Sequence, residues 1–389
     1  MDPEPMSRRD WLKLGATGVA GLSGAAVLRM AGRSEAADAM EAAGVGQDAG
    51  YGGADTVDAG LAEDRARATP PSEVPTQADV RHSLEGTSQA RMGVYEGGKP
   101  GDGFDPRQYL TEFDGGEVVQ EGETTVHEYD FVALDREIEV APGVWFPAWT
   151  YNGRVPGPTI RVPEGDVIRV NFQNAGSHPH TIHFHGIHAP EMDGVFPVVD
   201  PGEKFVYEFE ARPAGLHMYH CHAVPLKRHI HKGLYGTFIV DPPGGREPAR
   251  EMVMLMNGFD TNFDADNEVY AVNTAAFFYQ SNPITVGVGD PIRVYLLNLT
   301  EFDFVNSFHL HAAMFDVYRT GTKPEPDEFT DTILMCQGER HILEFELENP
   351  GLHMFHAHQS EFAELGWMGF FDAVPELAAD EGVPVYRYG

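Results

Sequence analysis

The sequence predicts an all-β protein that contains two similar β-sandwich domains. Residues 202–222 match residues 338–358 without a gap, at an offset of 136 residues, and a repeat of this length indicates a duplicated domain rather than a solenoid. Both copies contain short β-prone runs between Gly and Pro turns, such as residues 205–210, and long helical patterns are scarce. The duplicated pattern therefore places two sandwiches in residues 116–245 and 250–378.

The first 37 residues have the pattern of an export signal. Arg8 and Arg9 precede an apolar run rich in Gly and Ala, from Leu14 to Leu28, and Ala36 and Ala37 offer a cleavage point. Twin arginines before a weakly hydrophobic run are typical of a Tat signal, and this run is short for a stable membrane span. We therefore expect an exported protein, extracellular or at the cell surface, with membrane tethering if the signal is not cleaved.

Composition predicts a flexible segment and an unusual surface. Residues 38–115 are rich in Gly, Ala, Asp and Glu and hold few large apolar side chains, which predicts a flexible acidic linker. The whole chain has a formal net charge of −33, with only 6 Lys against 21 Arg. Such a surface repels nucleic acid, so we expect no nucleic-acid partner. An acidic, lysine-poor, exported chain resembles proteins of halophilic archaea, for which molar salt screens self-repulsion.

Four His-X-His pairs, two in each repeat, are the residues with the clearest chemistry. The pairs are His183 with His185, His220 with His222, His309 with His311, and His356 with His358. Alternate residues of a strand share a face, so each pair directs two imidazoles to the same side. Eight imidazoles are what three copper ions need if one takes two and the others take three each, and the matched sets argue against ordinary solvated histidines.

One cysteine marks a second kind of site in the first repeat. Cys221 stands between His220 and His222, and on a strand it points away from both imidazoles. The candidate ligands on the cysteine side are Cys221, His180 and His229. In the second repeat their places are taken by Ala357, Asn306 and Phe362, respectively. Because all three ligands are missing together, we interpret them as one site. Two His and one Cys form the blue-copper arrangement, which suits one-electron transfer.

The axial position of this copper site falls at Leu234, which cannot coordinate a metal. Loss of an axial thioether should favour the reduced ion and raise its reduction potential. The strand that carries Cys221 would join the two kinds of site through a few covalent bonds. The other cysteine, Cys336, is expected to be a small core residue rather than a disulfide partner.

At this point the motifs resemble those of two-domain multicopper oxidases of the laccase-like kind, over roughly residues 120–378. The motifs are the run from His180 to Gly186, the run from His220 to His222 with the downstream His229, and the run from Asn152 to Ile160. The resemblance implies two cupredoxin-like Greek-key β-sandwiches. It also implies a homotrimer whose trinuclear copper clusters lie between the first domain of one subunit and the second domain of the next.

The resemblance assigns each candidate ligand to one of four coppers per chain. The type 1 copper would be bound by His180, Cys221 and His229, with Leu234 at the axial position. The type 2 copper would be bound by His183 and His309. The two type 3 coppers would be bound by His185, His220, His222, His311, His356 and His358.

The function implied by the resemblance is an oxidase that takes single electrons at the type 1 copper and reduces O2 to water at the trinuclear cluster. The electron donor stays open among small molecules, metal ions and redox proteins. Protons must come from acids near the cluster, and the candidates by position in the sequence are Asp193, Glu361 and Glu364.

Copper nitrite reductases are the main alternative, because the spacing from Cys221 to His229 resembles theirs as well. Those enzymes use one type 2 copper with three histidines and a catalytic Asp, and this chain has His183 at the position of that Asp. They also lack the imidazoles that His222 and His311 supply here. These differences favour O2 over nitrite. A copper-binding electron-transfer protein without turnover is a further alternative.

Overall fold

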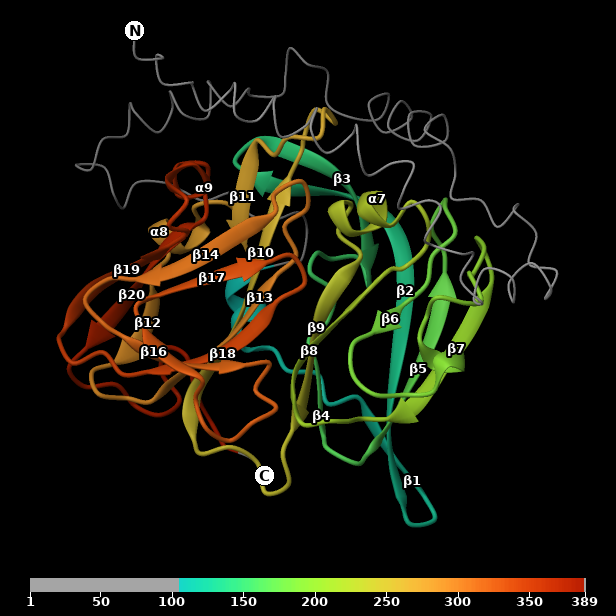
Figure 1. Ribbon diagram of the computed structural model, residues 1–389, viewed down its shortest axis with the longest axis horizontal. Coiled ribbons are helices and arrows are strands. Elements are labelled where there is room, and N and C mark those ends of the chain that lie inside the picture. Colours follow the sequence, from blue (N-terminus) through green and yellow to red (C-terminus); the bar gives the residue numbers. More distant parts are fainter. Residues whose placement is uncertain (1–104, 388–389) are drawn as a thin grey trace, which may run out of the picture. The chain divides into compact units, whose positions relative to one another are not determined.

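The computed structural model describes residues 105–387, and strands dominate this part of the chain (Figure 1). The strands form four sheets, two for each of two sandwich domains, so the predicted all-β class is confirmed. The predicted export signal and residues 38–104 of the predicted linker lie outside the described residues. Within residues 105–387, no helix is long and apolar enough to cross a membrane.

The first domain contains a five-stranded and a four-stranded sheet. The five-stranded sheet consists of β1 (Glu117–Glu121), β2 (Thr124–Ala141), β3 (Val144–Tyr151), β5 (Val167–Asn174) and β7 (Lys204–Glu210). The four-stranded sheet consists of β4 (Ile160–Pro163), β9 (Tyr235–Asp241), β8 (Gly215–His220) and β6 (His183–Phe184). Two short helices, η2 (Pro190–Met192) and α7 (Leu226–His231), lie in the connections between these strands.

The second domain contains a seven-stranded and a five-stranded sheet. The larger sheet consists of β10 (Ala249–Phe259), β11 (Val269–Val272), β13 (Ile292–Asn298), β15 (Phe315–Arg319), β16 (Glu328–Thr330), β18 (Arg340–Phe345) and β21 (Val385–Tyr386). The smaller sheet consists of β12 (Ile284–Gly287), β20 (Met368–Val374), β19 (Gly351–His356), β14 (Val305–Leu310) and β17 (Thr332–Cys336). Helices α8 (Phe278–Ser281) and α9 (Ser360–Glu364) complete it.

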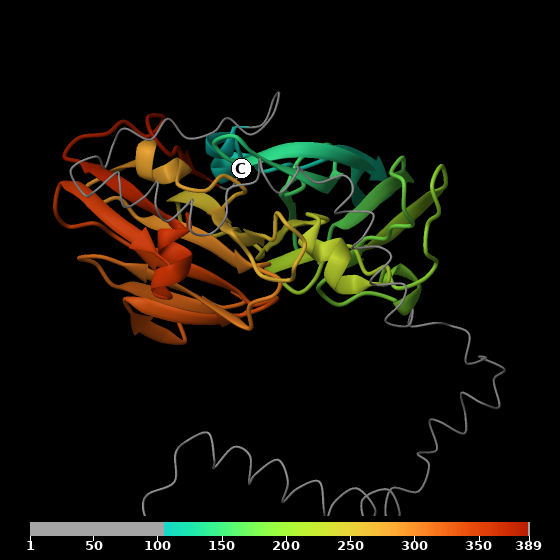
Figure 2. The same cartoon turned by 90° about the horizontal axis from the view of Figure 1, so that it is seen from above.

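The two domains share their strand connectivity, as the sequence repeat predicts. In the first domain β2 runs parallel to β5, and β5 runs antiparallel to β7; in the second domain β10, β13 and β18 pair in the same way. The order β4-β9-β8-β6 likewise matches β12-β20-β19-β14. Helices α7 and α9 follow β8 and β19, and Figure 2 shows each of them, yellow-green and red, beside the strands of its own domain.

Three clusters of buried apolar side chains hold these sheets together. One fills the first sandwich and includes Tyr219, and another fills the second sandwich and includes Trp367. The third cluster joins the two domains, because it contains Phe146 of β3 together with Tyr295 of β13. The apolar area removed from water in these clusters is the main favourable term in folding.

The structure corrects three expectations from the sequence. The predicted linker does not extend to residue 115, because residues 106–111 form helix α6 (Pro106–Thr111), which begins with an Asp-Pro signal and buries Tyr109 and Leu110. The second domain does not end at residue 378, because β21 pairs with β10. Cys336 is exposed and free, since the alternation along β17 places Ile333 and Met335, and not Cys336, on the buried face.

Candidate metal centre

Two antiparallel strand pairs bring the histidine pairs of each domain together. β6 pairs with β8, so that His183 lies opposite His220, and β14 pairs with β19, so that His309 lies opposite His356. Each of these four strands contains the first histidine of a pair, and the second histidine follows just beyond the end of the strand. Paired strands therefore fix the first imidazoles, and short connections position the others.

The four imidazoles of each domain have nearly the same arrangement. In the first domain, the ring centroid of His183 lies 5.0 Å from that of His185, 5.1 Å from that of His220 and 5.5 Å from that of His222. In the second domain, the ring centroid of His309 lies 4.8 Å from that of His311, 5.3 Å from that of His356 and 5.3 Å from that of His358. The Nε2 atoms also converge, at 3.2 Å between His185 and His220 and 3.0 Å between His311 and His356.

Backbone carbonyl groups fix the orientation of four of these rings. The Nδ1 atoms and their carbonyl partners are His183 with Asp193 at 2.6 Å, His309 with Asp331 at 2.8 Å, His220 with Cys221 at 2.9 Å, and His356 with Ala357 at 2.7 Å. A carbonyl only accepts, so Nδ1 carries the proton and donates it to the hydrogen bond. The Nε2 lone pair of each ring is then available to a metal ion.

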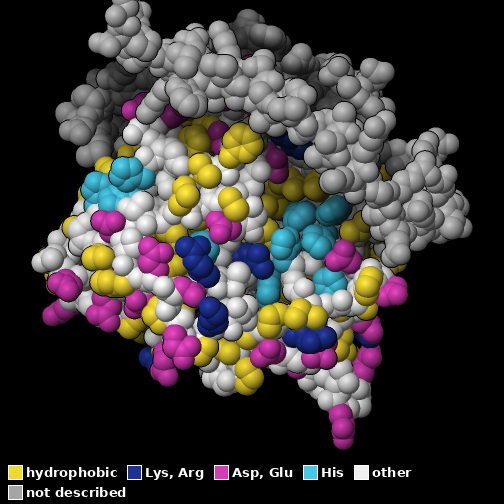
Figure 3. All heavy atoms as spheres, viewed as in Figure 1, with side chains coloured by type: hydrophobic (Ala, Val, Ile, Leu, Met, Phe, Trp, Pro, Cys, Tyr) yellow, Lys and Arg dark blue, Asp and Glu magenta, His cyan; other side chains and the backbone are white. Residues whose placement is uncertain are grey.

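Desolvation favours the neutral, metal-binding form of five of these imidazoles. Desolvation lowers the pKa of His185 to about 2 and that of His220 to about 4, and it also lowers the pKa values of His183, His311 and His356. Within residues 105–387, the groups of three that could hold a metal ion draw their histidines from one domain at a time. Figure 3 shows histidine side chains in two separate patches of this face. Each domain thus gathers its own set of imidazoles.

The predicted type 1 ligands converge in the first domain. The Sγ atom of Cys221 lies 3.2 Å from Nδ1 of His229 and 4.0 Å from Nδ1 of His180, and the two Nδ1 atoms are 3.2 Å apart. Helix α7 carries His229, and all three side chains are buried. Leu234 is also buried, and its carbonyl accepts a hydrogen bond of 2.9 Å from the Cys221 N–H.

Burial favours the uncharged forms of the three side chains at this site. Burial raises the pKa of the Cys221 thiol to about 11, and it lowers the pKa of His180 to about 3 and that of His229 well below its usual value. A bound cation is what would hold the buried thiol as the thiolate. One soft sulfur and two neutral imidazole nitrogens in this arrangement suit copper.

Trp149 covers this site and was not identified from the sequence. Its ring centroid lies 5.2 Å from that of His180, 4.8 Å from that of His229 and 4.5 Å from that of His178. The guanidinium of Arg228 lies 4.7 Å from the indole centroid. No motif could have found Trp149, because β3 belongs to the other sheet of the sandwich.

The equivalent space in the second domain is filled by apolar side chains. Ala357 and Phe362 are buried, and Phe362 stacks on Tyr270 at 4.1 Å between ring centroids. Trp367 follows α9 and is fully buried in the core cluster. The predicted loss of the whole cysteine site is therefore matched by a packed core.

Acidic side chains approach His183 and His309, the two histidines that the family resemblance would assign to a type 2 copper. Asp193 is one of the proton-donor candidates from the sequence, and its Oδ1 atom lies 3.3 Å from Nδ1 of His183. Asp331, which sequence reasoning missed, takes the equivalent place at 4.0 Å from Nδ1 of His309. Of the other candidates, Glu361 and Glu364 lie on α9, just beyond His358.

Comparison with known proteins agrees with this geometry. Models of the family described as multicopper oxidase match residues 135–245 and 246–376. A solved structure described as a multicopper oxidase is 50% identical, with a TM-score of 0.69, and the match covers 70% of this chain and 98% of that one. The blue copper oxidase of Nitrosomonas europaea is 28% identical, with a TM-score of 0.57, and the match covers 64% of this chain and 86% of that one.

A curated relative bears a different functional name. The copper-containing nitrite reductase of Neisseria gonorrhoeae is 30% identical over 239 residues, which are 56% of this chain and 60% of that protein. The chain thus spans about three fifths of the length of this relative. Two sandwiches with a Cys/His site in one and paired imidazoles in both define a class of copper proteins. The chain belongs to the multicopper oxidase family.

Proposed function

We propose that the protein is an oxidase that couples one-electron oxidation of a donor to the four-electron reduction of O2 to two molecules of water. The observation that carries this proposal is the pair of matched imidazole sets, four in each domain, beside one buried Cys/His site. A single copper beyond the Cys221 site would leave most of these eight nitrogen donors unused, whereas a trinuclear cluster would use them all.

The side chains present fit four coppers per chain. His180, Cys221 and His229 would hold the type 1 ion, because their donor atoms already lie within 4.8 Å of one another. His183 and His309 would hold the type 2 ion. The ligands of the two type 3 ions would be His185, His220, His222, His311, His356 and His358.

The two imidazole sets support a homotrimer in which clusters form between subunits. Each set gathers within one domain, so a complete cluster needs the set of a neighbouring chain. The set of the second domain is open, since His311 and His358 are exposed. Exposed apolar side chains lie on the strands beside it, Leu334 on β17 and Leu352 on β19, and such side chains are typical of contact surfaces.

Copper, when bound, supplies one-electron transfer at the Cys221 site and a joint four-electron reduction of O2 at the imidazole cluster. The protein provides the connection, because Cys221 is covalently linked to His220 and His222. The hydrogen bonds from Nδ1 to backbone carbonyls hold the imidazoles in one tautomer and one orientation. The Asp193 carboxylate can hold a proton beside His183, and each O2 consumes four protons.

Reduction of nitrite is the second candidate function, because curated relatives with that name align over 239 residues. The resemblance to nitrite reductases places a catalytic Asp where this chain has His183, and it leaves the imidazoles of His222 and His311 without a role. These three positions favour O2 as the acceptor.

Copper counting and anaerobic reduction test the proposal. The expected result is four coppers per chain and a thiolate absorption band that a reductant bleaches without air and O2 restores. Two coppers per chain, with nitrite and not O2 restoring the band, would establish the reductase instead. A band that neither acceptor restores would identify an electron-transfer protein without turnover.

We also propose that the protein is exported through the Tat system in the folded state. Arg8 and Arg9 support this, and a folded cargo can acquire its metal before export. Replacing both arginines with lysine should keep the protein inside the cell, and unchanged appearance outside the cell would contradict the proposal.

A further inference from the structure

We propose that Arg228 and Lys232 act as two fixed positive charges beside the Cys221 site and raise its reduction potential. This inference deepens the proposed oxidase function, and it rests on that function only for the copper ion that the Cys221 site would hold. It assigns a role to two side chains that bind no metal themselves.

Cationic side chains gather around this site although the chain as a whole is strongly acidic. Residues 225–233 include helix α7 with the ligand His229, and they contain Lys227, Arg228 and Lys232 but no carboxylate. The whole chain has only 6 Lys and a net charge of −33. Two of the six lysines therefore lie within nine residues, and the local charge is opposite to that of the molecule.

The second repeat lacks these cations together with the ligands of the cysteine site. Residues 358–366 take the place of residues 225–233 and end, like them, at the Gly two residues before the next strand. They contain two carboxylates, Glu361 and Glu364, but no Lys or Arg, and Glu361 takes the place of Arg228. The cations thus occur in the copy that has the Cys/His site and not in the copy where apolar side chains fill that space.

Both cations contact the indole of Trp149, which packs against the ligands. The guanidinium carbon of Arg228 lies 4.7 Å from the centroid of the indole, and Nζ of Lys232 lies 5.6 Å from it. The same centroid is 4.8 Å from that of His229 and 5.2 Å from that of His180. A Trp ring attracts a cation over its face. The two charges are therefore held one side chain away from the ligands.

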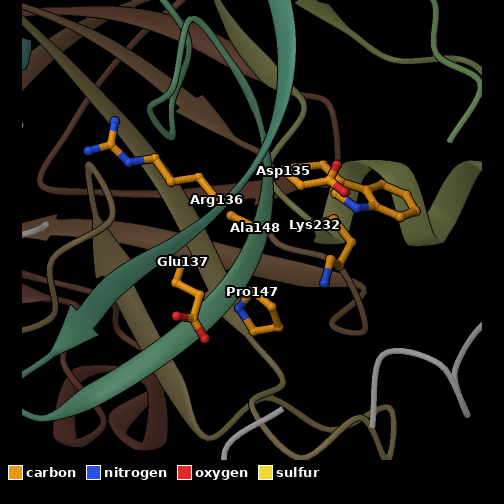
Figure 4. Close-up of a pocket in the computed structure, with 7 residues that line it drawn as sticks. Asp135, Arg136, Glu137, Pro147, Ala148 and Lys232 are labelled. Carbon is orange, nitrogen blue, oxygen red and sulfur yellow. The ribbon is translucent and has the colours of Figure 1, made fainter. Parts of the chain in front are cut away.

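Lys232 is a cation inside the protein. It is 2% exposed, and its Nζ lies 5.1 Å from the ring centroid of Phe263 and 5.2 Å from that of Phe146. Together with Trp149 these rings stabilise the ammonium, where burial alone would favour the neutral amine. Figure 4 shows Lys232 and Asp135 among the side chains that line one pocket, so a carboxylate lies in the same region.

Burial lets these charges act on the site through the protein rather than through water. His180 is 0% exposed and His229 is 3% exposed, and charges interact more strongly across such an interior than across solvent. The oxidised ion carries one more positive charge than the reduced ion, so fixed cations favour the reduced ion. Burial lowers the pKa values of His180 and His229 most, and the charge of Arg228 lowers both further, whereas Asp135 acts on His180 in the opposite direction.

The test is an anaerobic spectroelectrochemical titration of the thiolate band in the copper-loaded full chain. Arg228→Met and Lys232→Met should each shift the equilibrium between the two oxidation states at least threefold towards the oxidised ion, which is about 28 mV for one electron. Arg228→Lys keeps the charge and should shift it less than 1.5-fold. Asp135→Asn removes a negative charge and should shift it towards the reduced ion. A change in packing alone would not follow the sign of the charge.

Lys227→Gln is the matched control, because Lys227 lies on the same helix but is exposed. In 1 M potassium chloride the screening length is about 3 Å, so the potential of this variant should equal that of the wild type. Arg228→Met and Lys232→Met should keep at least half of their low-salt shift, because partly or fully buried charges are screened much less.

An unchanged potential in Arg228→Met and Lys232→Met, with the band intact, overturns the proposal. A fall in Arg228→Lys as large as that in Arg228→Met overturns it as well. If Lys232→Met does not fold, Arg228→Met, Arg228→Lys and Asp135→Asn decide the question, because neither Arg228 nor Asp135 is fully buried.

Failure of the oxidase function has a different signature. It would appear in the wild type, as a bleached band that O2 does not restore, and the reduction potentials of all variants would still be measured. Normal recovery with O2 together with potentials that do not depend on these charges would reject only the role of Arg228 and Lys232.

Discussion

At the scale of single residues, the same hydrogen bonds recur in the two domains. The Thr181 hydroxyl accepts from the His222 N–H at 3.0 Å, and the Ser307 hydroxyl accepts from the His358 N–H at 2.8 Å. His217 and His353 occupy equivalent positions outside the metal sets, and each bonds through Nε2 to the carbonyl four residues earlier, at 2.8 Å. The hydrogen bonds around the paired imidazoles are therefore the same in both domains, whereas the cysteine site is present in the first domain and absent from the second.

Replacing Cys221 with Ser tests the division of labour between the two kinds of site. We expect the thiolate band to disappear and the copper count to fall from four to three per chain, because the hydroxyl is a poor ligand for this ion. Oxidation of a donor should fall to background, since the electron entry is lost. Copper analysis and visible absorption check this, and Cys336→Ser, at the exposed free cysteine, is the matched control. Loss of all four coppers in Cys221→Ser would contradict separate sites.

Replacing Asp193 with Asn tests the acid beside His183. The backbone carbonyl of Asp193 still holds the ring, so we expect copper content and the thiolate band to be unchanged. Reoxidation by O2 should slow by roughly tenfold, the lower end of the usual effect of residues that support metal ligands, and the slowing should grow as the pH rises and free protons become scarce. Stopped-flow reoxidation across pH measures this. Asp200→Asn, an exposed change in the same connection, should have no effect, and an equal loss in both variants would contradict the role of Asp193.

The sequence was sufficient to predict which side chains gather at the two sites but not the residues that contact them. His180, Cys221 and His229 could be predicted because they share a motif and disappear together from the second repeat. Trp149 and Asp331 could not, because each reaches its histidine through pairing of strands distant in sequence, and a single Trp or Asp on a strand carries no pattern. Leu234 is buried as expected, while its axial role stays a prediction.

At the scale of elements, the duplication explains most of the architecture. Alternating runs and the repeat predict two sandwiches, and the matched order of β4-β9-β8-β6 and β12-β20-β19-β14 agrees with this. Helix α6 and strand β21 were missed, because they are short and gain their stability from contacts with distant strands rather than from local pattern. Both elements pack near β10, the first strand of the second domain.

A buried ion network ties β4 and β9 of the first domain to β10 of the second. Arg161 makes a bidentate ion pair with Asp241, at 2.7 and 2.9 Å, and a further short contact with Glu251. Tyr386 of β21 lies against the same guanidinium, at 3.7 Å from the ring centroid. All three charged side chains are almost completely buried.

Replacing Arg161 with Met should lower the free energy of unfolding by about 3–5 kcal/mol, because the buried Asp241 carboxylate loses its bidentate partner, although Glu251 keeps its ion pair with Arg293. Chemical unfolding of the metal-free protein measures this loss. Arg169→Met, which breaks an exposed network with Glu121 and Glu208, is the matched control and should be clearly milder, since water solvates the carboxylates left behind. Equal losses in the two variants would contradict the importance of burial.

At the scale of the whole molecule, the proposed trimer links assembly to copper content. Leu334 is 61% exposed on β17, the edge strand next to β14, and two residues from Thr332, whose hydroxyl lies 2.8 Å from Nδ1 of His309. A charge at this position should prevent a neighbouring chain from docking.

We expect Leu334→Asp to sediment as a monomer, to keep the thiolate band and to lose the cluster coppers, because the Cys221 site lies within one domain and the cluster does not. Analytical ultracentrifugation with copper analysis measures both properties. Val118→Asp, at 57% exposure on the edge strand β1 of the first domain, should stay trimeric with four coppers per chain. A monomeric Leu334→Asp that retains four coppers would reject clusters between subunits.

The net charge of −33 leads to a prediction about salt that separates exposed from buried charges. The screening length falls from about 10 Å at 0.1 M to about 3 Å at 1 M salt, so repulsion between exposed carboxylates should weaken steeply over this range. The unfolding midpoint of the wild type should therefore rise with potassium chloride into the molar range. Arg161→Met should be less stable than the wild type by nearly the same amount at every salt concentration, because its two carboxylates are buried and are screened much less. A wild-type midpoint that does not rise would reject adaptation to high salt. A deficit of Arg161→Met that vanishes in molar salt would show that the network at β4, β9 and β10 is open to solvent.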